Sequence, residues 1–278
     1  MTSHLFLSNL RLPGLLGTLL LLAILATPSS LVAEPEPAAT SGFNAYIAQA
    51  ESRLARQHAS PNGFLAPTRD SQSEARLRNG DLIVEQVTSS SGVDLPGAML
   101  HHWRGTAFAP KATAADFERL MKDFGAYPQQ FSPDVLQARA LSQPGARDKD
   151  HFQVWMRVRR HYVITVVLDT TYDVIFSRID PRHGYSISRS TQISEIESPG
   201  TSKERSMSPA EDHGFLWRLN TYWTYEERDG GLYMQIETVS LSRSIPRGLG
   251  WAVGPFVETV PRESLEATLR STCNALRK

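Results

Sequence analysis

Residues 217–276 decide the fold, and they read WRLNTYWTYEERDGGLYMQIETVSLSRSIPRGLGWAVGPFVETVPRESLEATLRSTCNAL. Two segments within this stretch, Trp217–Glu226 and Leu232–Ser242, are rich in aromatic and β-branched residues. Such residues favour strands. The residues between the two segments, 227–231, include two glycines, which suit a tight turn. The stretch therefore begins with a predicted β-hairpin.

After the hairpin the apolar residues change to a helical spacing. This spacing predicts helices over Arg247–Phe256 and Pro261–Leu276, and Pro261 suits the first turn of the second one. The second helix carries one apolar stripe, made of Leu265, Leu269, Thr272, Cys273 and Leu276. Because Cys273 lies on this stripe and no histidine is near it in sequence, we interpret it as a buried, unreactive thiol.

Upstream of the hairpin the chain alternates strand-like segments with two helical ones. The predicted strands are 81–88, 98–108, 151–160, 161–178 and 184–197. A short helix is predicted after Thr113, which suits an N-cap, and an amphipathic helix over Phe43–His58. This order predicts an α+β fold of the helix-grip type. A curved antiparallel sheet would wrap around the long C-terminal helix, with an extra N-terminal helix.

Residues 81–278 resemble the START-like superfamily, also called SRPBCC, helix-grip or polyketide-cyclase-like. The resemblance lies in element order and in four stretches, HHWRG (101–105), YVITVVL (162–168), YSISRST (185–191) and ETVSLSRSIP (237–246). It implies a cavity between the sheet and the C-terminal helix that receives a lipid, a sterol or another apolar molecule. Some members are enzymes, but the stretches that match here carry no catalytic signature.

Polar residues on otherwise apolar strand faces are candidates for ligand contacts. Arg189 shares a face with Tyr185, and Glu237 shares one with Tyr233, because alternate strand residues point the same way. We expect Arg189 and Glu237 to form the polar end of an apolar pocket. The alternative is a structural ion pair, or exposure to solvent. The aromatic residues expected to line the pocket are Trp103, Trp155, Trp223, Tyr225 and Trp251, with plain core packing as their alternative.

Composition excludes several classes of protein. The 278 residues carry 29 Lys+Arg and 29 Asp+Glu, which argues against nucleic-acid binding. The single cysteine excludes an intramolecular disulfide and a multi-cysteine zinc site. His101 and His102 would face opposite sides of a strand and could not ligate one metal together. We therefore predict no metal site, no cofactor and no catalytic residue.

The N-terminal segment resembles a secretion signal. Residues 1–33 combine one positive charge, an apolar run over Leu15–Ala26 and a small-residue exit at Val32-Ala33. Residues 34–80 would then form a Pro-rich linker, over Glu34–Ser41, and the N-terminal helix. The mature protein would be periplasmic or extracellular, and an uncleaved membrane anchor is the alternative.

The predicted function is that of an exported, monomeric, non-catalytic protein that binds a lipid or another apolar small molecule. One rival is a cyclase- or aromatase-like enzyme, in which Arg189 and Glu237 act on the substrate. The other is an envelope adaptor without a pocket. The apolar, glycine-rich stretch Ile245–Phe256 would be a pocket mouth in transient contact with a membrane, or else a buried two-part helix.

Overall fold

The protein is described from a computed structural model that covers residues 34–60, 63–66, 72–88, 93–142, 150–161, 165–244 and 250–277, without the side chains of 161 and 250–258. Its helical elements are α2 (Pro37–His58), α3 (Ser73–Arg78), α4 (Ala114–Lys122), η2 (Phe124–Ala126), α5 (Tyr127–Gln130) and α6 (Gly250–Leu276). Its strands are β1 (Ile83–Gln86), β2 (Val93–Leu95), β3 (Ala98–Pro110), β4 (Val135–Ala140), β5 (His151–His161), β6 (Thr165–Arg178), β7 (His183–Glu197), β8 (Arg205–Ser206), β9 (Arg218–Arg228) and β10 (Gly231–Arg243). The predicted signal segment lies outside the described residues.

The described strands form one antiparallel sheet. Its order is β1-β3-β10-β9-β7-β6-β5-β4, with β2 added to β3 and β8 added to β7. The predicted hairpin is confirmed as β9 and β10, joined at Asp229 and Gly230. Both residues have positive φ angles, 57° and 76°, as the two central positions of a type I′ hairpin turn require.

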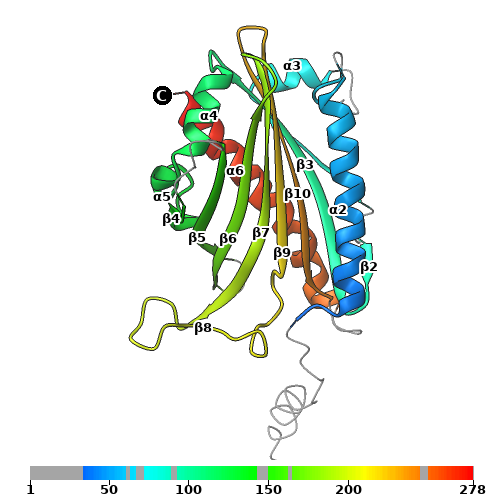
Figure 1. Ribbon diagram of the computed structural model, residues 1–278, viewed down its shortest axis with the longest axis vertical. Coiled ribbons are helices and arrows are strands. Elements are labelled where there is room, and N and C mark those ends of the chain that lie inside the picture. Colours follow the sequence, from blue (N-terminus) through cyan, green and yellow to red (C-terminus); the bar gives the residue numbers. More distant parts are fainter. Residues whose placement is uncertain are drawn as a thin grey trace, which may run out of the picture. The chain divides into compact units, whose positions relative to one another are not determined.

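The C-terminal helix α6 covers one face of the sheet, which we call the inner face. In Figure 1, α6 passes behind the strands. A Cβ atom on Gly105 of β3 would lie 2.6 Å from Leu269 Cδ1, so glycine at this position lets the helix approach the strand closely. The predicted helix-grip fold is confirmed. The prediction of two separate C-terminal helices is wrong, because α6 continues through Pro261 as one helix.

The N-terminal helix α2 covers the other face, which we call the outer face. Val239 and Leu241 of β10 share a buried cluster with Phe43 and Ile47 of α2, whereas Met234 belongs to the cluster under α6. Odd and even residues of a strand point to opposite faces, so the two helices lie on opposite sides. The helix begins at Pro37, inside the segment predicted as a linker, because proline fits a first helical turn.

The short helix α4 begins where the sequence predicts. Thr113 is its N-cap: the Thr113 hydroxyl accepts from Asp116 N (3.1 Å), and Asp116 Oδ2 accepts from Thr113 N (3.0 Å). This capping box satisfies backbone donors that would otherwise lack a partner. Phe117 and Met121 of α4 are buried in the same cluster as Leu265 and Leu269 of α6. The helix thus closes one end of the inner layer.

Candidate functional site

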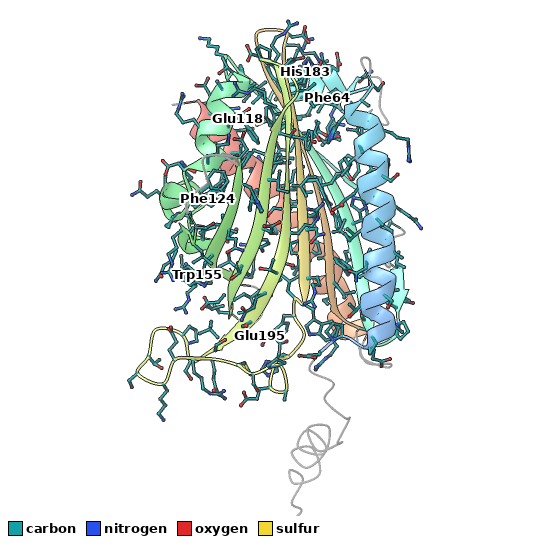
Figure 2. All side chains as sticks on the ribbon, viewed as in Figure 1. Phe64, Glu118, Phe124, Trp155, His183 and Glu195 are labelled. Atoms are coloured by element: carbon teal, nitrogen blue, oxygen red, sulfur yellow. The ribbon has the colours of Figure 1, made fainter. Side chains whose placement is uncertain are left out.

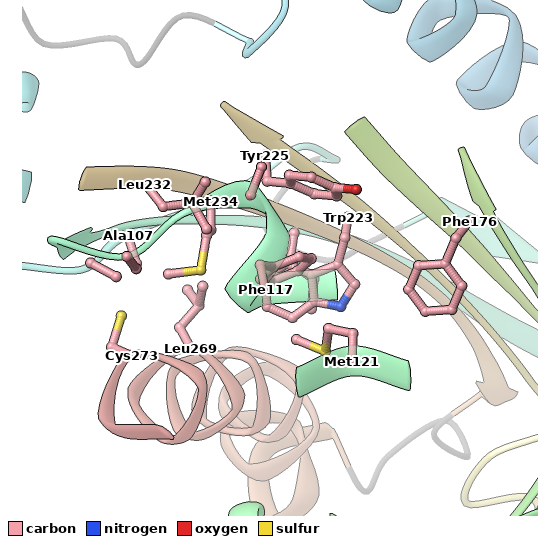
Figure 3. Packing of buried hydrophobic residues seen from close by; sticks show 14 of the residues in the cluster. Ala107, Phe117, Met121, Phe176, Trp223, Tyr225, Leu232, Met234, Leu269 and Cys273 are labelled. Atoms are coloured by element: carbon pink, nitrogen blue, oxygen red, sulfur yellow. The ribbon is translucent and has the colours of Figure 1, made fainter. Parts of the chain in front are cut away.

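One half of the inner face is filled by apolar side chains. Leu269 and Cys273 point from α6 towards Ala107 and Met234, and Phe117, Met121 and Trp223 pack beside them (Figure 3). Burial raises the pKa of the Cys273 thiol. Cys273 is therefore buried as predicted, in a closed and dry part of the interior.

The other half of the inner face is built from small hydroxyl-bearing residues. Strand register places Trp103, Thr238, Thr221 and Ser188 opposite one another in a row across β3, β10, β9 and β7. The next row towards the start of α6 contains Ser240 and Ser190 together with the larger residues His101 and Leu219, and the Ser190 hydroxyl accepts from Leu219 N at 2.9 Å. We call these residues the hydroxyl rows. Their hydroxyl-bearing residues are all partly exposed, although they lie on central strands.

The indole of Trp103 is the most unusual polar group in these rows. Its side chain belongs to the inner cluster, and the residue is only 8% exposed. The indole Nε1–H finds no hydrogen-bond acceptor among the residues that the structure describes. A buried donor without an acceptor costs about 1–3 kcal/mol. The interior therefore offers a polar group that a bound molecule could satisfy.

The architecture is that of an antiparallel sheet whose inner face is closed by a C-terminal helix. Beneath this helix, one half of the sheet face is apolar and the other half carries small residues. The chain has a START-like fold. This agrees with the resemblance drawn from the sequence, and it rests on the strand order and on the position of α6.

Several solved structures resemble this one in fold. A protein from Thermus thermophilus is 13% identical, with a TM-score of 0.44 over 62% of this chain and 94% of its own. A START superfamily protein from Mycobacterium smegmatis is 14% identical, with a TM-score of 0.42 over 63% and 96%. A STAR-related lipid transfer protein from Xanthomonas axonopodis is 15% identical, with a TM-score of 0.41 over 72% and 99%. No family model and no curated protein matches the sequence.

Three of the predicted site residues meet on the inner face. Trp103, Trp223 and Tyr225 all belong to the cluster that α6 covers. Tyr225 donates its hydroxyl to Glu118 Oε1 (2.7 Å), and burial followed by this carboxylate raises the pKa of the phenol. Glu118 in turn accepts from Arg178 Nε (2.8 Å). Tyr225 is thus tied to a structural ion pair.

The predicted position of Arg189 and Glu237 at the polar end of the pocket under α6 is wrong. Both point to the outer face, towards α2, because they occupy the strand positions that alternate with the inner residues. Arg189 forms a two-pronged ion pair with Glu51 of α2, in which both N···O distances are 2.8 Å. Tyr222 also donates to Glu51 (3.0 Å). Arg189 therefore fits the alternative interpretation, a structural ion pair, with a partner on α2.

Glu237 lies at the centre of a buried polar cluster on the outer face. It is 1% exposed and accepts from His102 Nε2 (2.7 Å) and from Arg53 of α2. The Tyr46 hydroxyl of α2 forms a hydrogen bond with His102 Nδ1 (2.9 Å), and Arg104 Nε lies 3.3 Å from Glu237 Oε1. Burial would raise the pKa of Glu237, but the bonds and charges of His102 and Arg53 outweigh it and lower the pKa to about 2.

The C-terminal end of α2 adds a half-buried histidine to this interface. His58 stacks on Tyr185, with ring centroids 4.3 Å apart, and its Nε2 lies 2.9 Å from the Thr224 hydroxyl. Burial lowers the pKa of His58 to about 4. Sequence reasoning missed His58, His102 and Tyr46 as members of one interface, because their partners come from separate segments. The only local signal was the amphipathic pattern of the N-terminal helix.

The two remaining predicted residues lie elsewhere. Trp155 also points away from the inner face, since its neighbour Val154 is buried in the inner cluster. The guanidinium groups of Arg139 and Arg157 lie 4.5 and 5.9 Å from the Trp155 ring centroid. Its predicted place in a pocket under α6 is therefore wrong. Trp251 lies on α6, and its side chain is outside the described residues.

Metal centres and membrane spans would be further sites of function. Within the described part of the chain, no group of three or more His, Cys, Asp or Glu side chains is arranged to hold a metal ion. None of the helices described there is both long and apolar enough to cross a membrane. The candidate site is the interior beneath α6, where Trp103 and the hydroxyl rows lie on the inner face.

Proposed function

We propose that the protein binds an apolar small molecule or lipid in the interior between the hydroxyl rows and the N-terminal half of α6. The observation that carries this proposal is the uneven inner face. One half is filled by large apolar side chains, whereas the other half carries small residues that stay partly exposed on central strands. Central strand faces are normally the best filled parts of a sheet.

The binding energy would come mainly from removing apolar ligand surface from water, at about 25 cal/mol per Å². A few polar groups would then set the ligand's orientation. Trp103 is the best placed of these, because its indole N–H has no acceptor within the described residues. A ligand with an uncharged acceptor oxygen, such as a carbonyl or ester group, would satisfy it.

We further propose that the protein is exported and acts as a carrier rather than an enzyme. Export is supported by the signal-like order of residues 1–33. A non-catalytic role is supported by the positions of the acidic residues. Glu237 and its partners face α2, and Glu118 is held by Arg178 and Tyr225. The enzyme alternative required Arg189 and Glu237 beside the ligand, and it loses that support.

The first experiment is native mass spectrometry of the mature protein purified from its own host, followed by organic extraction. A stoichiometric apolar adduct is the expected result, and it would identify the ligand class. A clean protein mass, together with no binding of a fluorescent fatty acid or sterol probe, would overturn the proposal.

A filling substitution then locates the site. Thr221→Trp places a large ring in the middle of the hydroxyl rows and should weaken probe binding by at least about tenfold while the protein stays folded. Thr191→Trp is the matched control, because Thr191 is exposed on the neighbouring strand β7. Equal binding by both variants would place the ligand elsewhere. Circular dichroism of both variants checks that they fold.

A further inference from the structure

The segment 212–217, directly before β9, is fastened to the strand on one side of β9. Gly214 O accepts from Arg243 N (2.8 Å), and Trp217 N donates to Leu241 O (2.8 Å), both near the end of β10. Gly214 has a φ of +78°, and a Cβ atom there would lie 2.7 Å from Arg243 Cβ. Only glycine allows this close approach to the end of β10.

The same segment is fastened to β7, on the other side of β9, through one carboxylate. Glu195 Oε1 accepts from the backbone amides of His213 (3.1 Å) and Phe215 (3.4 Å). Glu195 Oε2 pairs with His213 Nδ1 at 2.7 Å. Figure 2 shows Glu195 at the end of the sheet where the long loop between β7 and β9 departs. Segment 212–217 therefore bridges two strands that do not pair with each other.

A second buried acid faces Glu195 within this bridge. Asp212 is 8% exposed and Glu195 is 3% exposed, and both accept from backbone amides of the same short segment, Asp212 from Gly214 and Glu195 from His213 and Phe215. Two carboxyl groups buried in one short segment favour a state in which one of them keeps a proton. The bond from Gly214 N to Asp212 Oδ1 is 2.5 Å long. Burial, followed by the charge of Glu195, raises the pKa of Asp212 to about 6.

Other charged groups near the pair come from the neighbouring elements. Arg243 of β10 donates to the backbone oxygen of Asp212 (3.4 Å), and its charge opposes the rise in the pKa of Asp212. Arg218 of β9 and Glu34 line the same cavity of about 200 Å³ as Asp212. The His213 side chain, 61% exposed, contacts Glu195 from the solvent side.

We propose that segment 212–217 is an acid-closed latch at the end of β10, the strand that leads into α6. The latch is closed while Asp212 and Glu195 share a proton, and it loosens when both carboxyl groups are ionised and repel each other. Nothing in this device depends on a bound ligand. It therefore stands or falls independently of the proposed function.

The direction of the pH effect follows from the pKa of Asp212, which is about 6 in the closed segment against an ordinary 3.8. Closure is fully favoured below about pH 4 and is lost as pH rises to about 6. Between about pH 5 and pH 7.5 the closed-to-open ratio should fall about tenfold.

The test is amide hydrogen exchange of the whole chain at about pH 5 and about pH 7.5, corrected for intrinsic exchange rates. Protection of the amides of His213, Gly214 and Phe215 should fall about tenfold at the higher pH. Asp212→Asn should remove this dependence, because an amide can donate to Glu195 at every pH. Asp180→Asn is the matched control: Asp180 also accepts from backbone amides and pairs with a histidine, without a second carboxyl group.

Each outcome is decisive. Loss of the pH dependence in Asp212→Asn, with its retention in Asp180→Asn, supports the latch. A wild-type profile without pH dependence at these amides overturns it, whether or not any variant folds. Retention of the full dependence in Asp212→Asn overturns it as well.

Discussion

The two faces of the sheet are covered by helices of very different chemistry. Under α6 the contacts are apolar, through residues such as Leu265, Leu269 and Met234. Under α2 the apolar contacts alternate with charged groups, centred on the buried Glu237 and the half-buried Glu51. In Figure 1, α6 runs diagonally behind the strands, and α2 runs alongside β3. The same strands thus serve one interface that excludes polar groups and another that depends on them.

The two interfaces therefore do different things. The apolar one holds α6 against the sheet, whereas the charged one also fixes where α2 lies on it. An apolar layer is non-directional, so it holds a helix firmly while allowing side chains to repack. A buried carboxylate needs its partners in specific places, because an unpaired buried charge is costly. Glu237 and Glu51 therefore favour one position of α2 on the sheet. The inner layer, which is apolar, does not fix the position of α6 in this way.

The largest expected effect comes from removing the charge at the centre of the outer cluster. Glu237→Gln leaves Arg53 and Arg104 without their carboxylate and should cost about 3–5 kcal/mol of unfolding free energy. Urea denaturation measures the loss. Glu197→Gln is the control, because Glu197 makes an exposed ion pair with Arg205 and should change stability by less than about 1 kcal/mol. Equal effects of the two variants would contradict a central role for Glu237.

The inner face is tested by truncating its main contact with the sheet. Leu269→Ala should cost about 2–5 kcal/mol, since the side chain is fully buried against Gly105. Hydrogen exchange should show loosening of α6 without loosening of α2. Simultaneous loosening of both helices would show that the two interfaces act as one unit.

The smallest effect expected is a loosening of α2 in mild acid. The pKa of His58 is about 4 when α2 is docked, against an ordinary value of 6.5. The stabilisation of the docked helix by neutral His58 is therefore fully present above pH 6.5 and is lost as pH falls towards 4. The full shift corresponds to about 3.4 kcal/mol, and because the His58 ring is only half-buried, solvent screening reduces the expected loss to about 2 kcal/mol. Glu237 adds a further loss of stability at lower pH, because its pKa is about 2 in the folded protein against an ordinary 4.5. This loss begins as pH falls below about 4.5.

The measurement for this pH effect is limited proteolysis or hydrogen exchange of α2 between about pH 7 and pH 4. His58→Gln should remove the change in α2 protection between about pH 6.5 and pH 4.5, because glutamine does not titrate in this range. His151→Gln is the control, since His151 pairs with Asp173 away from α2. A rise in α2 protection on acidification would reverse the expected sign. The latch at Asp212 should respond in the opposite direction, which makes the two regions distinguishable in one experiment.

Much of the strand pattern could be predicted because it is local. Alternation along β10 grouped Tyr233, Gln235, Glu237, Val239 and Leu241 on one face, and the structure confirms that grouping. On β7 the alternation holds from Tyr185 to Arg189 and then breaks. A bulge opposite Thr171 leaves Thr191 without a partner in the ladder and shifts the phase. A bulge of this kind leaves no reliable trace in the alternation itself.

The assignment of faces could not be predicted in the same way. Period-two spacing states which residues share a face, but not which layer covers it. The expectation that places Arg189 and Glu237 under α6 is therefore wrong. Their actual partners, Glu51 and Arg53, lie on a helix more than a hundred residues away in sequence.

The sequence by itself determined most of the order of strands and helices, the hairpin of β9 and β10, the cap of α4 and the apolar stripe of α6. Each of these depends on residues close together in sequence, where backbone geometry dictates the pattern. Only the tertiary structure decided that α2 covers the outer face, that His102 and not His101 meets Glu237, and that Asp212 meets Glu195. Those contacts join segments far apart in sequence, and the cost of burying unpaired polar groups selects them only after the chain has folded.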